Sequence, residues 1–99
     1  MDKFVVRIDA ELEDLIPGYL DNRREDIRQI EQCLEKGDFE TIRRLAHRMK
    51  GSGGGYGFDR ITEIGAAMEQ AAIQAHAVKT REQLELLRDY LVRVEIVYV

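Results

Sequence analysis

The chain has 99 residues, of which 44% are hydrophobic and 34% charged, with a net charge of −4. This length predicts one globular domain with a modest core and little room for a substrate cleft, and the acidic balance argues against binding to nucleic acid. No apolar run is long enough to span a membrane, and the opening MDKFVVRID is too short and too charged for a signal peptide. We therefore expect a single cytoplasmic domain over residues 1–99, not attached to a membrane.

The N-terminal part of the chain predicts a short arm followed by a long helix. FVVRI (4–8) is β-prone, but without a hairpin partner we expect it to pack as an N-terminal arm. Asp9 suits the cap of a short helix. Pro17 either occupies the first turn of the long helix or kinks a continuous one, and Gly37 suits its end after Lys36. The apolar residues that recur at helical spacing are Ile16, Leu20, Ile27, Ile30 and Leu34.

Three further helices follow. Asp38 is placed to cap the second, and the third begins near Phe58 or Asp59. The fourth opens at Thr80, because Gln83 three residues later completes a capping-box pattern, and it continues to near the C-terminus. Their apolar faces comprise Phe39, Ile42, Leu45, Ala46 and Met49; Phe58, Ile61, Ile64, Gly65, Met68 and Ala72; and Leu84, Leu87, Leu91 and Val94. Because the connections are short, we expect an all-α fold, an antiparallel up-down four-helix bundle with a short N-terminal arm or helix.

The phase of the second helix places His47 on its exposed side. At 100° per residue, the apolar residues centre near Ile42 and Met49, and His47 lies about 150° from that centre. A lone histidine is often a core residue, but this phase excludes that interpretation. His47 is therefore expected to face solvent, either with a function or as an ordinary surface residue.

The residues around His47 form a local basic surface. Positions three and four apart on a helix are neighbours, which places Arg43 and Arg44 on one side of the imidazole and Lys50 and Gly51 on the other. Glycine within a helix costs about 1 kcal/mol relative to alanine; if the helix continues through GSGGG (51–55), the missing side chains give a large partner access to the ring, and if it ends there the glycines form a turn. The residues expected to face a partner are Arg43, Arg44, Arg48, Gly51 and Gly54.

An exposed imidazole among cations predicts a specific chemistry. Neutral histidine is a nucleophile near pH 7, and neighbouring cations disfavour the imidazolium form that would remove its lone pair. The same cations stabilise an incoming phosphoryl group. These features together favour acceptance of a phosphoryl group on nitrogen.

The motif AHRMKGS (46–52), followed by Gly57, resembles the AHxLKGSxxxxG signature of histidine-containing phosphotransfer (HPt) domains. Gly37 and Asp38 precede the motif at the family spacing, and GAAMEQA (65–71) matches the following helix, so the resemblance covers nearly the whole chain. It implies a four-helix bundle that carries phosphate in two-component phosphorelays, between aspartates of response-regulator receiver domains or with a hybrid sensor histidine kinase. It implies no kinase activity and no resident cofactor, because the receiver supplies Mg²⁺.

The resemblance also implies roles for individual residues. His47 matches the phosphorylated residue, which accepts phosphate through Nε2, and Lys50 matches the cation that holds the phosphoryl group. Gly51 matches the small residue that gives a receiver access. Glu69 stands where the family often has a glutamine or glutamate that hydrogen-bonds Nδ1, which fixes the tautomer and leaves Nε2 as the nucleophile.

Other interpretations fit the residues less well. A nucleotide-binding loop of the form G-x-x-x-x-G-K-[ST] fails because Lys50 precedes the glycines. No metal site is expected, since His47, His76 and Cys33 lie in three different segments, and His76 is expected to be a solvated loop residue. The main alternative is a helical interaction module that docks on a receiver or kinase without phosphotransfer. We expect a monomer, because four helices close a core within one chain.

Overall fold

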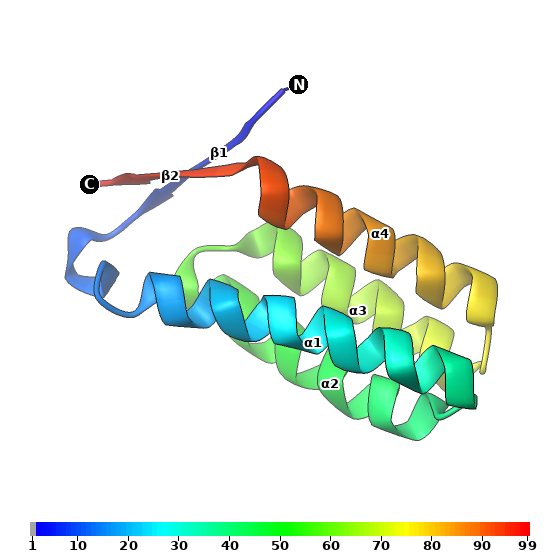
Figure 1. The fold of residues 1–99 in the computed structure, drawn as a ribbon. Helices are drawn as coiled ribbons and strands as arrows, with labels where there is room; N and C mark the ends of the chain where they lie inside the picture. The colour runs from blue at the N-terminus through cyan, green and yellow to red at the C-terminus, as the bar shows by residue number, and fades with distance from the viewer. Residues whose placement is uncertain (1) are drawn as a thin grey trace.

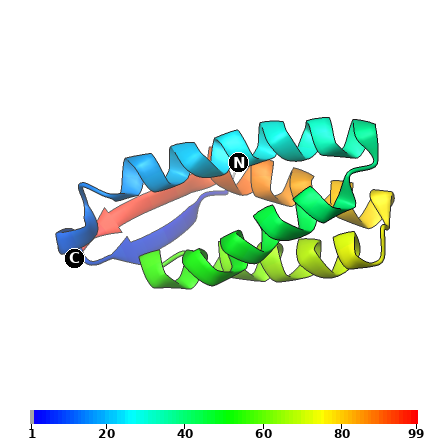
Figure 2. The same ribbon diagram turned by 90° about the horizontal axis from the view of Figure 1, so that it is seen from below.

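Four helices packed side by side dominate the computed structural model, which describes residues 2–99 (Figure 1). Figures 1 and 2 show that successive helices run in opposite directions along the long axis of the molecule. The predicted all-α, antiparallel up-down bundle is therefore confirmed. The helices are α1 (Ile16–Lys36), α2 (Phe39–Gly53), α3 (Asp59–Ile73) and α4 (Ala77–Arg93), with the 3-10 turns η1 (Ala10–Leu12) and η2 (Gly54–Tyr56).

Local signals set both ends of α1 and the start of α2 as predicted. Pro17 lies in the first turn of α1 and does not kink it. Gly37 ends α1 with φ of 68°, a left-handed conformation that glycine adopts without strain. The side chain of Asp38 then caps α2 by accepting a hydrogen bond of 3.1 Å from the backbone of Thr41. Asp9 accepts in the same way from Glu11, but the element that it caps is only the 3-10 turn η1.

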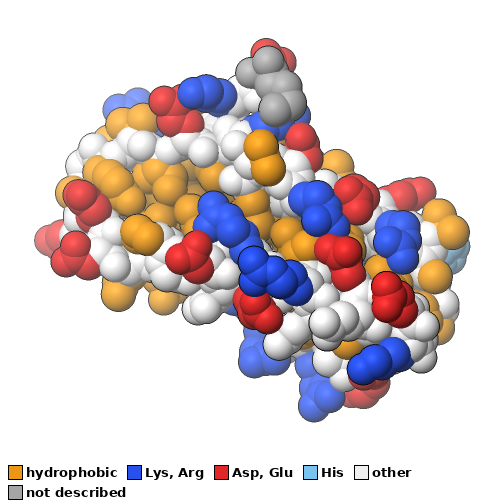
Figure 3. All heavy atoms as spheres, in the orientation of Figure 1, with side chains coloured by type: hydrophobic (Ala, Val, Ile, Leu, Met, Phe, Trp, Pro, Cys, Tyr) orange, Lys and Arg blue, Asp and Glu red, His pale blue; other side chains and the backbone are white. Residues whose placement is uncertain are grey.

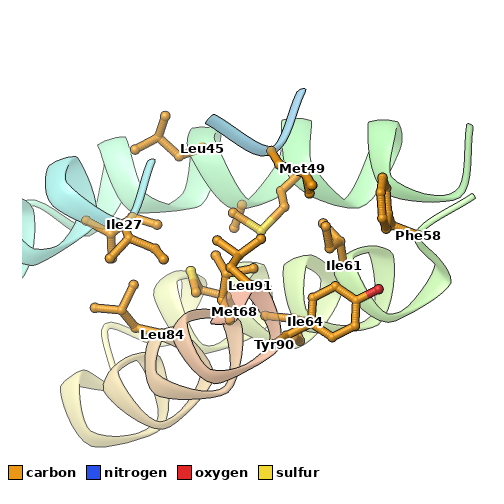
Figure 4. Packing of buried hydrophobic residues seen from close by; sticks show 14 of the residues in the cluster. Ile27, Leu45, Met49, Phe58, Ile61, Ile64, Met68, Leu84, Tyr90 and Leu91 are labelled. Atoms are coloured by element: carbon orange, nitrogen blue, oxygen red, sulfur yellow. The ribbon is translucent and has the colours of Figure 1, made fainter. Parts of the chain in front are cut away.

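The core lies along the centre of the bundle, where all four helices contribute apolar side chains (Figure 4). Nearly every residue predicted for the apolar faces is buried; Leu34, Phe39 and Val94 are only partly buried. Burying one large aliphatic or aromatic side chain stabilises the fold by about 1.5 to 3 kcal/mol. Figure 4 shows residues from all four helices converging there, including Ile27, Leu45, Met49, Ile64, Met68, Leu84 and Leu91.

The two ends of the chain form a small sheet, which corrects two expectations. Strand β1 (Phe4–Ile8) pairs in parallel with β2 (Val94–Tyr98), with Phe4 opposite Val94 (Figure 2). The predicted arm is therefore a strand, and the prediction that the fourth helix includes Val94 is wrong, because α4 ends at Arg93. The partner of each strand lies about ninety residues away in the sequence, so no local hairpin pattern predicts the pairing.

The start of α4 also differs from the prediction. The helix begins three residues before Thr80, and the cap is His76, whose Nδ1 accepts a hydrogen bond of 3.2 Å from the backbone of Lys79. The Thr80 side chain is instead fully buried and donates to the backbone carbonyl of His76 at 2.9 Å. The capping-box assignment was wrong because a threonine hydroxyl also bonds back along a helix. His76 is exposed and lies between α3 and α4, as expected, and it also caps α4.

The surface mixes both signs of charge. On the face drawn in Figure 3, the Lys and Arg side chains alternate with Asp and Glu side chains in small groups. Several of them form ion pairs within one helix, such as Arg24 with Asp21 and Arg28 with Glu25. Within residues 2–99, no helix combines the length and the apolar character that crossing a membrane requires.

Candidate functional site

His47 lies on the outer side of α2, as its helical phase predicts. Its side chain is 63% exposed, whereas Ile42 and Met49 on the opposite side of the same helix are fully buried. The apolar face of α2 packs into the bundle and thereby fixes the direction in which the imidazole points. The ring is therefore accessible to a partner while its backbone is held by the core.

Glu69 on α3 reaches across to α2 and contacts two side chains there. One carboxylate oxygen, Oε2, lies 2.7 Å from Nδ1 of His47, and the other, Oε1, accepts a hydrogen bond of 2.8 Å from Nζ of Lys50. Glu69 is itself only 8% exposed at its side chain. An ionised carboxylate only accepts hydrogen bonds, so Nδ1 carries the proton of the neutral ring and the lone pair resides on Nε2. The predicted contact between Glu69 and Nδ1 is thus present.

The charge state of Glu69 follows from the same contacts. The hydrogen bond from Lys50, followed by that from His47, lowers the pKa of the Glu69 carboxyl below its ordinary value. Burial acts in the opposite direction but does not prevail. Glu69 is therefore an anion at neutral pH, which is the state that holds Nδ1–H.

This lowered pKa predicts a pH dependence of stability. A carboxyl with a lower pKa in the folded state stabilises the fold when it is ionised; that contribution is complete well above the ordinary value of 4.5 and is lost as the pH falls through the folded pKa. Urea unfolding should therefore show wild type as more stable than Glu69→Gln at pH 7. The difference should shrink toward pH 3. A difference of the same size at both pH values would contradict this account of the carboxylate.

The glycine segment continues the helix instead of forming a loop. Helix α2 extends to Gly53, and η2 carries the chain to the left-handed Gly57 before α3 begins. A β-carbon on Gly51 would meet no atom within 4 Å, so this position is open to solvent. The open question left by the sequence therefore resolves in favour of helix over 51–53 and of a 3-10 turn over 54–56.

Thr62 joins the end of this segment to α3. Its hydroxyl accepts a hydrogen bond of 2.8 Å from the backbone of Gly54 and donates one of 2.9 Å to the carbonyl of Lys50. Sequence reasoning missed this residue, because a threonine within a helix carries no sign of a bond to a neighbouring helix. It also missed the hydrogen bond of 2.9 Å between the hydroxyls of Tyr19 and Ser52, which ties α1 to α2.

The predicted arginines border His47 without binding it. Arg43, Arg44 and Arg48 line a shallow hollow together with His47. Arg43 pairs with Glu40 at 2.6 Å, and Arg44 donates to the hydroxyl of Thr41 at 3.3 Å. Exposed pairs of this kind contribute little to stability, so these guanidinium groups remain able to meet an anionic partner.

The structure thus brings some predicted site residues together and leaves others at the periphery. His47, Lys50 and Glu69 form one hydrogen-bonded group. Gly51 and Gly54 follow on the chain, and the backbone N–H of Gly54 donates to the hydroxyl of Thr62. No cluster of three potential metal ligands occurs within residues 2–99.

The comparison with known families agrees with this arrangement. The family described as the Hpt domain matches residues 10–96, which include α2 with His47 and α3 with Glu69. The chain belongs to the Hpt family. No curated protein and no solved structure matches it. Hpt domains are phosphocarrier modules of phosphorelays rather than autonomous kinases. The feature of this Hpt domain that bears on such a role is its exposed histidine, whose Nδ1 lies against the carboxylate of Glu69.

Proposed function

We propose that this Hpt domain accepts a phosphoryl group on His47 from the phosphoaspartate of a receiver domain and passes it to another receiver. The observation that carries the proposal is the carboxylate of Glu69 at 2.7 Å from Nδ1. This contact keeps the proton on Nδ1, so that the exposed ring presents Nε2 as a nucleophile. Membership in the Hpt family supports the same role in general terms.

The proposed step exchanges one bond for another. The lone pair of Nε2 attacks phosphorus in line, an N–P bond forms, and the P–O bond to the aspartate breaks with its electrons leaving on the carboxylate. The product ring has a hydrogen on Nδ1 and a phosphoryl group on Nε2, and the anionic Glu69 offsets the positive charge that the ring acquires. Transfer to the next receiver is the reverse of this step.

Lys50 is proposed to serve the phosphoryl group itself. Its side chain is 40% exposed and its Nζ already lies next to the site, bound to Glu69 at 2.8 Å. A flexible ammonium group at this place is able to turn toward the phosphoryl oxygens and stabilise their charge. Gly51 leaves the space above the next helical turn free for the receiver, which brings its own Mg²⁺ and lysine.

Arg43, Arg44 and Arg48 are proposed to steer the receiver, whose active site is acidic. Long-range attraction of this kind accelerates association and is screened by salt. The double variant Arg43→Glu and Arg44→Glu should therefore associate with a receiver about 10-fold more slowly at low salt, and the difference should largely disappear at 1 M salt. Stopped-flow association kinetics would measure both rates.

A matched variant controls for net charge. Arg28→Glu with Arg81→Glu makes the same change in charge on exposed arginines of α1 and α4, which line other hollows than the one at His47. Association of this variant should stay close to that of wild type. Equal slowing of both variants would assign the effect to overall charge and contradict local steering.

The proposed function is tested by phosphoryl transfer. Several receiver domains are charged with labelled phosphate from a small-molecule donor and mixed with this chain. The labelled phosphate that appears on the chain is then followed by electrophoresis. We expect rapid transfer from at least one receiver. Binding to a receiver that transfers phosphate to another Hpt domain, but none to this chain, would contradict the proposal and leave a docking module.

A further inference from the structure

Helices α2 and α3 approach each other more closely than a β-carbon allows. A β-carbon built on Gly65 of α3 would lie 2.6 Å from the backbone nitrogen of Lys50 and 3.0 Å from the carbonyl oxygen of Ala46. One built on Gly53 of α2 would lie 2.7 Å from the backbone nitrogen of Thr62. These obstacles are backbone atoms, which no rotamer change can move aside.

The contact at Gly65 lies next to the hydrogen-bonded group of His47, Lys50 and Glu69. Ala46 and Lys50, the residues of α2 that Gly65 touches, flank His47 on the same helix. Glu69 is four residues after Gly65 and therefore lies on the same face of α3, one turn further along. The stretch of α3 that carries Glu69 is thus held directly against the stretch of α2 that carries His47.

The reach of Glu69 depends on this spacing. Its two carboxylate oxygens lie 2.7 Å from Nδ1 of His47 and 2.8 Å from Nζ of Lys50, and the side chain spans the whole distance from the α3 backbone. Lys50 is long and flexible and follows small displacements. The short imidazole of His47 is fixed close to its own backbone. If the seam between α2 and α3, which is the close contact at Gly53 and Gly65, becomes wider, the bond to Nδ1 is therefore the one that breaks.

We propose that Gly65 is a positioning residue of this site. By letting α3 lie against the α2 backbone at Ala46 and Lys50, it brings the carboxylate of Glu69 within hydrogen-bonding distance of Nδ1 and so determines which ring nitrogen of His47 is free. This inference rests on the proposed function for its consequence in phosphotransfer, but its structural part concerns the tautomer of His47 alone.

The test compares three glycine-to-alanine variants. Gly65→Ala pushes α3 away from α2 at the site, Gly53→Ala creates a similar clash about one helical turn nearer to η2, and Gly18→Ala adds a methyl group to α1 where nothing lies within 4 Å. Nitrogen-15 NMR of the neutral His47 ring reports the tautomer directly. We expect the Nδ1–H tautomer to predominate in wild type, Gly53→Ala and Gly18→Ala, and a mixture of both tautomers in Gly65→Ala.

The same variants give a rate. Phosphoryl transfer from a receiver should be about 10- to 100-fold slower in Gly65→Ala, the usual cost of losing a residue that orients a reacting side chain. If Gly53→Ala and Gly65→Ala, checked for folding by circular dichroism, mix the tautomers equally, general loosening explains the result and the proposal is overturned. An unchanged tautomer in Gly65→Ala overturns it as well.

A second variant keeps the test decisive if Gly65→Ala does not fold. Glu69→Asp leaves the seam intact and shortens the carboxylate by one methylene group. If the spacing is limiting, the aspartate no longer reaches Nδ1 and both tautomers appear; a retained Nδ1–H tautomer would show slack in the seam and overturn the proposal. Because these readouts need no receiver, an absence of phosphotransfer in wild type would refute the proposed function without touching the positioning role.

Discussion

Replacement of His47 by glutamine is expected to abolish phosphoryl acceptance and to leave the fold intact. Glutamine has a similar length but lacks a nucleophilic nitrogen, because its amide lone pair is delocalised. The side chain of His47 is 63% exposed, so its replacement leaves no cavity in the core. Loss of its hydrogen bond to Glu69 should lower the free energy of unfolding by about 0.5 to 1.5 kcal/mol. Transfer from a labelled receiver and urea unfolding of the same preparation measure the two quantities.

The second histidine of the chain provides the matched control. His76→Gln changes an exposed histidine at the start of α4 that is not part of the proposed site. This variant should accept phosphate at the wild-type rate. Label that persists on His47→Gln, or that disappears from His76→Gln, would show that His47 is not the acceptor.

Truncation of Phe58 to alanine is expected to cause a large loss of stability. The side chain lies fully buried just before α3 (Figure 4), and its ring stacks on that of Tyr19 with centroids 5.7 Å apart. Removing a buried phenylalanine costs about 3 to 5 kcal/mol, a substantial part of the 5 to 15 kcal/mol that typical domains possess. Urea unfolding monitored by circular dichroism would measure the change.

A control at the other end of α3 separates the effect of burial from that of shortening an apolar side chain. Ile73→Ala also shortens an apolar side chain of α3, but this residue is 57% exposed, so its effect should stay within about 0.5 kcal/mol. A loss below about 1 kcal/mol in Phe58→Ala would mean that the core collapses around the missing ring. It would contradict the view that Phe58 fixes the junction between η2 and α3.

The helices are the part of the fold that the sequence predicts well. Their apolar residues recur with a period close to 3.6, and the signals at their ends act locally, as Pro17, Gly37 and Asp38 show. Such signals depend only on neighbouring residues, so they can be recognised in the sequence alone. The end of α2 was left open because the glycines beyond Lys50 are compatible with both helix and turn, and the choice depends on Thr62 from another helix.

The pairing of the chain ends was not predictable in the same way. The run Phe4–Ile8 has β-propensity, yet a strand requires a partner, and that partner begins at Val94. Val94 also fits the apolar spacing of the fourth helix, so the change from helical to strand periodicity at this residue was not visible in the sequence. At the start of that helix, the choice between Thr80 and His76 as cap depended on burial of the threonine, which no local pattern reveals.

The candidate site was predicted in part. Helical phase placed His47 on the surface, and the resemblance indicated Lys50 and Glu69. What the sequence lacked was the distance between α2 and α3, because the close approach at Gly65 appears only when two helices are packed. The group that orders the imidazole is therefore a property of the tertiary structure, although each of its members is visible in the sequence.

The position of the phosphoryl group on the phosphorylated chain decides whether His47 carries it through Nε2. The chain is labelled with nitrogen-15 at histidine, charged by a phosphorylated receiver, and examined by phosphorus-31 and nitrogen-15 NMR, with lability in acid as a second criterion. We predict an acid-labile phosphoryl group on Nε2 of His47, with Nδ1 protonated and bound to Glu69. Phosphate on Nδ1, on another residue, or in an acid-stable linkage would contradict the account.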